Sequence, residues 1–89
     1  MRAVLTVLGV DRVGIIAAVT AVLAESNTNI LDISQTIVSG LFTMIMIVDL
    51  AVANVDFRTL HDRLTQKGEV LGMEIRLQRE EIFRSMHRI

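Results

Sequence analysis

The residues of this chain best suited to chemistry lie at 9–16, where an apolar run ends at an acid and a glycine. Residues 3–8 are mostly apolar and so are residues 17–24, which predicts a strand, a turn and a helix. Asp11 is expected to cap this helix by accepting a hydrogen bond from the Gly14 N–H. Gly14 would admit a ligand carboxylate to the helix N-terminus, where N–H groups and the dipole favour an anion. A structural interpretation is equally open, in which Asp11 only caps and Gly14 only allows close packing on a strand.

Asn29 is the second candidate for ligand binding. It closes a polar break at residues 26–29 and opens a strand over 30–38. We expect this strand to end near the same edge of the sheet as the 11–14 loop, so that the loop faces Asn29. An amide side chain both donates and accepts hydrogen bonds, which suits the two charged groups of an α-amino acid.

No catalytic set is visible in the sequence. His61 and His87 are isolated and the chain has no cysteine, so we predict no metal site, no disulfide and no cofactor. Met44, Met46 and Met73 fit an adaptable core better than a ligand pocket.

Composition bounds the class of protein. The chain has 89 residues, enough for one domain; 52% of them are hydrophobic and the net charge is −1. It has 3 Phe, no Trp or Tyr and no basic stripe, which excludes an RNA-binding sheet and argues against nucleic-acid or anionic-membrane partners. The longest helix-like apolar stretch is shorter than the roughly 20 residues that span a bilayer, and no signal peptide is recognisable, so we expect a cytoplasmic protein. A domain of this size leaves much of its surface exposed, and with so few polar residues part of that surface must be apolar. This favours a homodimer.

The elements that position the candidate residues follow from periodicity and turn residues. The first helix should begin at Arg12 or Val13 and end at Glu25, while Asp56 starts the second helix and Gly68 stops it. The predicted strands are 2–8, 30–38, 41–50 and 72–79, and residues 80–89 form a charged tail with room for one short helix.

The strands at 30–38 and 41–50 predict a hairpin turning at Ser39 and Gly40. The first of them alternates as a half-buried strand does. If Val38 faces Leu41, the cross-strand pairs are Ile37–Phe42, Ile33–Met46 and Leu31–Val48 on one face, and Thr36–Thr43 and Ser34–Ile45 on the other. A slip of one residue would break up the apolar set, so the register is well specified.

The order β-α-β-β-α-β with right-handed crossovers predicts an α+β fold, the ferredoxin-like sandwich. The first and third strands are apolar on both faces and take the centre. The four-stranded antiparallel sheet then has the order 4-1-3-2, with two helices on one face. The open face should carry Val4, Thr6, Asp32, Ser34, Thr36, Thr43, Ile45 and Ile47. It is too apolar for open water, which again favours a partner.

The chain resembles an ACT domain at residues 11–16, in the Ala-rich helix after them, and at Asn29 and Ile30. This is the small regulatory module attached to many enzymes and regulators of amino-acid metabolism. The resemblance covers residues 1–79, and 80–89 form a tail beyond it. Residues 29–36 and 86–89 also resemble short stand-alone ACT proteins related to glycine-cleavage-system regulators.

The resemblance implies a non-catalytic homodimer that senses a small amino acid at the first strand–helix loop, near the subunit interface. Carried over by position, the ligand-binding residues are Asp11, Arg12, Val13, Gly14, Ile15, Asn29 and Ile30. Many family members have proline where this chain has Val13, which implies a less rigid loop here. We expect no attached enzyme, so that any output would pass through an unidentified regulated protein.

Two other functions stay open. The chain could be an assembly module that needs no ligand. It could also be an acylphosphatase-like hydrolase, since small acylphosphatases share this fold and hold phosphate in the first strand–helix loop with an arginine, a role for Arg12. Asp11 would repel that anion, and their longer Gly-rich loop is missing here.

Overall fold

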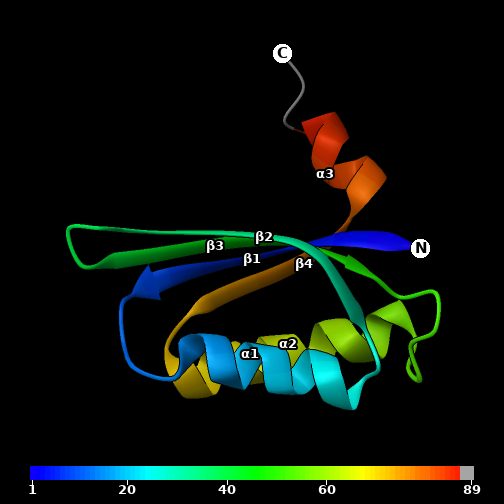
Figure 1. Cartoon of the computed structure of the whole chain (residues 1–89), viewed down its shortest axis with the longest axis horizontal. Coiled ribbons are helices and arrows are strands. Elements are labelled where there is room, and N and C mark those ends of the chain that lie inside the picture. Colours follow the sequence, from blue (N-terminus) through cyan, green and yellow to red (C-terminus); the bar gives the residue numbers. More distant parts are fainter. Residues whose placement is uncertain (87–89) are drawn as a thin grey trace.

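The computed structural model describes residues 1–86 and contains three helices and four strands within them. They are β1 (Arg2–Val10), α1 (Ile15–Glu25), β2 (Asn29–Val38), β3 (Leu41–Asp49), α2 (Phe57–Leu71), β4 (Glu74–Arg79) and α3 (Glu80–Met86). The strands form one antiparallel sheet in the order β2-β3-β1-β4, and α1 and α2 lie side by side against one face (Figure 1). The predicted ferredoxin-like order, with the first and third strands at the centre, is confirmed. His87 lies outside the described residues.

The core forms between the sheet and the two helices because the residues of β1 and β3 that face the helices are apolar. Leu5 of β1, Met44 and Met46 of β3 and Leu60 of α2 are fully buried there. Each such side chain contributes about 1.5–3 kcal/mol relative to an exposed one. An aliphatic and methionine core therefore holds the sheet to the helices, as the composition predicts.

The register of the hairpin is confirmed except at its far end. Val38 faces Leu41, Ile37 faces Phe42, Ile33 faces Met46, Thr36 faces Thr43 and Ser34 faces Ile45. Opposite Val48, however, lies Ile30 and not the expected Leu31, because the strand carries an irregularity between Ile30 and Asp32. An extra residue in one strand shifts every pair beyond it by one.

The expectation that β2 is half-buried is wrong. Ile30 is partly buried against the core and the other nine residues of this strand are exposed. Ile33 and Ile37 keep 46% and 58% of their surface exposed although they share a face with the core. The reason is that β2 lies at the edge of the sheet, beyond the buried rows of β3 and β1.

The start of α1 differs from the prediction in two ways. The helix begins at Ile15, and Gly14 is its N-cap, with φ 91° in the left-handed region. No side chain caps it, so Asp11 does not play the predicted role. Instead the Asp11 N–H donates to the Gly40 carbonyl at 2.8 Å, which keeps Asp11 attached to the sheet.

The second helix begins as predicted but ends later. Asp56 caps α2 by accepting from the Thr59 N–H at 2.8 Å. Gly68 does not stop the helix, which continues to Leu71 and ends at Gly72, φ 69°. Gly68 serves close packing, because a Cβ there would lie 2.7 Å from the Met73 carbonyl oxygen.

The tail helix α3 lies on the side of the sheet away from α1 and α2 (Figure 1). Glu80 at its start pairs with Arg2 at 3.0 Å and with Arg84 at 3.3 Å. Phe83 lines a hollow over the open face together with Val4, Ile45, Ile47 and Arg84. The register places the predicted open-face residues on this side, and α3 leaves Ile45 exposed.

Replacing Gly68 should reveal the close approach of α2 to the chain after it. We expect Gly68→Ala to lower the free energy of unfolding by about 1–2 kcal/mol, because the added methyl must displace backbone. Alanine is the better helix former, so helix propensity alone would give the opposite sign. Urea denaturation measures the change, with Thr65→Ala on the exposed face of the same helix as a control. Equal or higher stability of Gly68→Ala would contradict the packing role.

The cap of α2 should make stability depend on pH. Hydrogen bonds from Thr59, from its side chain and then its backbone N–H, lower the pKa of Asp56 below its ordinary 3.8. A lowered folded-state pKa means that the cap stabilises the fold above pH 3.8 and is lost as the pH falls through the folded value. Asp56→Asn keeps a cap that does not titrate. We expect the melting temperature of the wild type to fall more steeply than that of Asp56→Asn between about pH 5 and pH 3; parallel curves would contradict this.

Candidate functional site

The loop between β1 and α1 presents free backbone donors. Gly14 adopts φ 91°, and a Cβ there would meet no atom within 4 Å. The glycine is therefore needed for its backbone conformation and not for close packing, which removes one structural interpretation of the sequence. Because no side chain caps α1 and no acidic residue occupies its first turn, its first N–H groups are left for water or a ligand.

A hollow of about 300 Å³ opens beside this loop. Its lining comes from the loop, from the first turn of α1 and from the sheet: Asp11, Arg12, Gly14, Ile15, Ile16, Ala17, Gln35, Ile37 and Phe42. Gln35 and Ile37 were missed in the sequence. They could have been predicted from the sheet order 4-1-3-2. In this order β1 and β2 run in the same direction, so the last residues of β2 lie at the same end of the sheet as the loop that follows β1.

Arg12 is held by α2. Its guanidinium Nη1 donates to the Leu71 carbonyl at 2.6 Å, at the last residue of that helix. A cation there also meets the negative end of the helix dipole. Arg12 therefore ties the loop to the end of α2, and this donor is already used within the fold.

The other loop residues differ in exposure. The Val13 side chain is fully exposed and is not part of the lining. Ile15 is 2% exposed and packs into the core, so it anchors the first turn of α1 beneath the loop. Four of the five predicted loop residues, Asp11, Arg12, Gly14 and Ile15, line the hollow, and Val13 does not.

Asn29 and Ile30 lie at the opposite end of the sheet. Asn29 faces Asp49, which faces Arg2, whereas the loop follows Val10 at the other end of β1. The length of β1 separates the two groups by about 26 Å. Within one chain the expectation that Asn29 faces the loop is therefore wrong. β1 and β2 both pair antiparallel with β3, so they run in the same direction, and the start of β2 lies beside the start of β1.

A second hollow surrounds Asn29, with Ala24, Asn27, Thr28 and Val52 as the rest of its lining. The Thr28 hydroxyl is buried and finds no hydrogen-bond partner among the described residues. Ile30 is partly buried against the core and fixes the start of β2. Both ends of the sheet thus carry one part of the predicted site.

The polar groups beside the β1–α1 loop are the first N–H groups of α1 and the Asp11 side chain. Within residues 1–86, no three His, Cys, Asp or Glu side chains gather as metal ligands would. His61 is half exposed and faces its neighbour Asp62 at 3.2 Å. In the same part of the chain, none of the helices has the length and apolar character needed to cross a bilayer.

Removing Arg12 tests its structural role. We expect Arg12→Ala to lower the free energy of unfolding by about 0.5–1 kcal/mol, because α2 loses a cation at its C-terminus and the loop loses its tie. Arg63→Ala is the control, since Arg63 has no partner among the described residues. Chemical denaturation provides the measurement. If Arg12→Ala were as stable as the wild type, the contact with Leu71 would be of no consequence.

Comparison with known proteins agrees with this fold. Residues 2–78 match the family model of the ACT domain. A UPF0237 protein from Methanocaldococcus jannaschii is 56% identical over 88 residues, which covers 99% of this chain and 98% of that protein. A UPF0237 protein from Lactococcus lactis is 52% identical over 89 residues, the full length of both.

Solved structures give the same result. An ACT domain protein from Streptococcus pneumoniae has a TM-score of 0.81 and 38% identity, over 93% of each chain. A putative glycine cleavage system transcriptional repressor has a TM-score of 0.72 at 22% identity, over 86% of this chain and 44% of that one, which shows a shared fold. Together these matches show that the chain belongs to the ACT domain family and, within it, to the UPF0237 proteins.

Proposed function

We propose that this protein is a non-catalytic regulatory module that works as a homodimer and senses a small amino acid at the β1–α1 loop. The observation that carries the proposal is the free outer edge of β2, together with the separation of the two half-sites in one chain. ACT domains are typically ligand-binding regulatory modules, which supports the class of function.

The two edges of the sheet are built differently. β4 has six residues and carries Glu74, Arg76 and Arg79, as protected edges do. β2 has ten residues, of which Asp32 alone is charged, and its apolar side chains other than Ile30 are exposed. An unprotected edge of this length is suited to pairing with another strand.

A second copy of the chain offers a matching strand. Pairing β2 with β2 of the partner about a two-fold axis is antiparallel and closes the assembly as a dimer. With the axis near Ile33 or Ser34, position 29 of one copy lies opposite positions 37–39 of the other. Asn29 of the partner subunit then reaches the hollow beside Ile37 and the loop.

A shared site of this kind suits an α-amino acid. The ligand carboxylate would accept from the uncapped N–H groups at the start of α1, beyond Gly14. Its ammonium group would donate to the Asp11 carboxylate and to the amide oxygen of Asn29 of the partner subunit. In this proposal Val13 and Ile15 shape the loop, Ile30 fixes the strand that carries Asn29, and Arg12 positions the loop. A hollow of about 300 Å³ is at the lower limit for ligand sites and favours a small side chain.

Such a ligand would couple binding to assembly. A molecule that contacts both subunits stabilises the dimer by its own binding free energy, and the dimer in turn raises the affinity for the molecule. The regulated partner protein would then recognise the liganded dimer. The contact between Arg12 and the Leu71 carbonyl gives the loop a direct connection to α2.

A thermal-shift screen against the twenty amino acids tests the proposal. At a ligand concentration of 100 Kd we expect about 2.7 kcal/mol of stabilisation. Gly14→Val and Asn29→Ala should each abolish the shift, because each homodimer lacks half of both sites. A mixture of the two variants should recover ligand binding, since every mixed dimer has one intact site. Thr65→Ala is the control that should respond as the wild type does.

Three results would contradict the proposal. A monomer at high micromolar concentration would remove the shared site. A dimer that responds to no amino acid would indicate an assembly module without a ligand. A mixture that binds no better than its two components would place the site within one chain.

A further inference from the structure

A second, separate binding site is indicated by the Lys and Arg side chains of the described residues. Six arginines have partners. Four of them form ion pairs: Arg2 and Arg84 with Glu80, Arg58 with Asp62, and Arg76 with Glu74. Arg12 donates to the Leu71 carbonyl, and Arg79 lies over the Phe57 ring. Arg63 and Lys67 are the two Lys or Arg side chains within residues 1–86 for which the structure gives no partner. Both line the same groove, between α1 and α2.

Arg63 and Lys67 are one helical turn apart on α2, where side chains four residues apart are neighbours. Two like charges in this arrangement repel one another, and no acidic residue stands three or four positions away on α2 to offset them. An anion between the two cations would remove this repulsion. The arrangement differs from that of Arg58, which meets Asp62 on the next turn.

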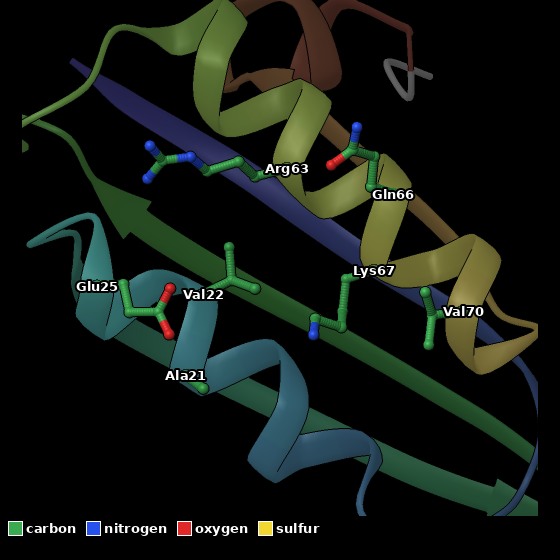
Figure 2. A pocket seen from close by; sticks show the side chains of 7 residues that line it. All are labelled: Ala21, Val22, Glu25, Arg63, Gln66, Lys67 and Val70. Carbon is green, nitrogen blue, oxygen red and sulfur yellow. The ribbon is translucent and has the colours of Figure 1, made fainter.

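The opposite wall of the groove supplies a carboxylate. Glu25, at the end of α1, forms no ion pair among the described residues. Figure 2 shows its carboxylate and the Lys67 amine directed over the gap between the two helices, with Arg63 at the same end as Glu25. Val22 lies between them, 7% exposed, and Val70 forms an apolar flank. The groove thus offers two positive groups, one negative group and an apolar surface.

We propose that this groove binds an α-amino acid with a side-chain carboxylate. Its two carboxylates pair with Arg63 and Lys67, its ammonium group pairs with Glu25, and its methylene groups lie on Val22. The net charge of −1 on such a ligand neutralises the net charge of +1 on the three side chains. A phosphate dianion is disfavoured because it has no cationic group to offset the charge of the Glu25 carboxylate.

The dimensions agree with a ligand of this size. The groove has a volume of about 280 Å³, near the lower limit of roughly 300 Å³ for ligand sites. The groove lies between α1 and α2 (Figure 2), and its lining shares no residue with the hollow beside the β1–α1 loop. The inference therefore does not depend on the function proposed for the loop.

Titration with L-glutamate, followed by amide NMR of the full chain at constant ionic strength, tests this site. We expect saturable shifts confined to the second half of α1 and to α2, at millimolar ligand. Arg63→Gln and Lys67→Gln should each weaken binding by about tenfold, the size expected for one charge-assisted hydrogen bond. Arg58→Gln, on the same helix outside the groove, should bind as the wild type does. The amide signals of residues 11–14 should not shift in the wild type, which separates this site from the loop.

Glutarate tests the role of Glu25, because it keeps both carboxylates and lacks the ammonium group. Wild-type protein should bind glutamate more tightly than glutarate. Glu25→Gln should abolish that preference by weakening glutamate and strengthening glutarate. Absence of saturable shifts in the groove, unchanged affinity of the Arg63 and Lys67 variants, or equal binding of the two ligands by the wild type would each overturn the proposal.

Discussion

The β1–α1 loop is held between two backbone carbonyls, and the organisation of the candidate site depends on this constraint. The Asp11 N–H donates to Gly40 in the β2–β3 turn, and the Arg12 guanidinium donates to Leu71 at the end of α2. Between these ties and Ile15 in the core, the chain must reverse within a few residues, which Gly14 allows with its left-handed conformation. The loop is thereby fixed while the first N–H groups of α1 stay uncapped.

The sheet explains why one chain does not bring the predicted ligand-binding residues together. Because β1 and β2 both pair antiparallel with β3, their last residues lie at one end of the sheet and their first residues lie at the opposite end. The loop and Asn29 are therefore separated by the length of the sheet in a monomer. A two-fold pairing of β2 edges reverses that relation between subunits, so dimerisation and ligand binding would depend on the same strand.

Much of this arrangement could be predicted from the sequence, because hydrophobic periodicity fixes which strands are central and which register the hairpin adopts. Asp56 could also be predicted as the cap of α2, because the contact depends only on residues three positions apart. Three features depend on tertiary contacts that no local pattern carries. Gly68 packs against the Met73 carbonyl, Arg12 meets the end of a helix 59 residues away, and β2 loses the burial that its alternation suggests by lying at the edge. The place of Asn29 could have been deduced, since the correctly predicted sheet order already sets its end of the sheet.

In the dimer that we propose, two β2 strands pair about an axis near Ile33 or Ser34. Cysteine scanning tests it directly, because the chain has no cysteine of its own. Residues on the axis face their own copies at about 4.5–5.5 Å between Cα atoms, within the range of a disulfide. Under mild oxidation, single cysteines at positions 33 and 34 should give covalent dimers, and those at positions 31 and 37 should give few. Uniformly low cross-linking along β2, or a maximum at either end of the strand, would contradict this pairing.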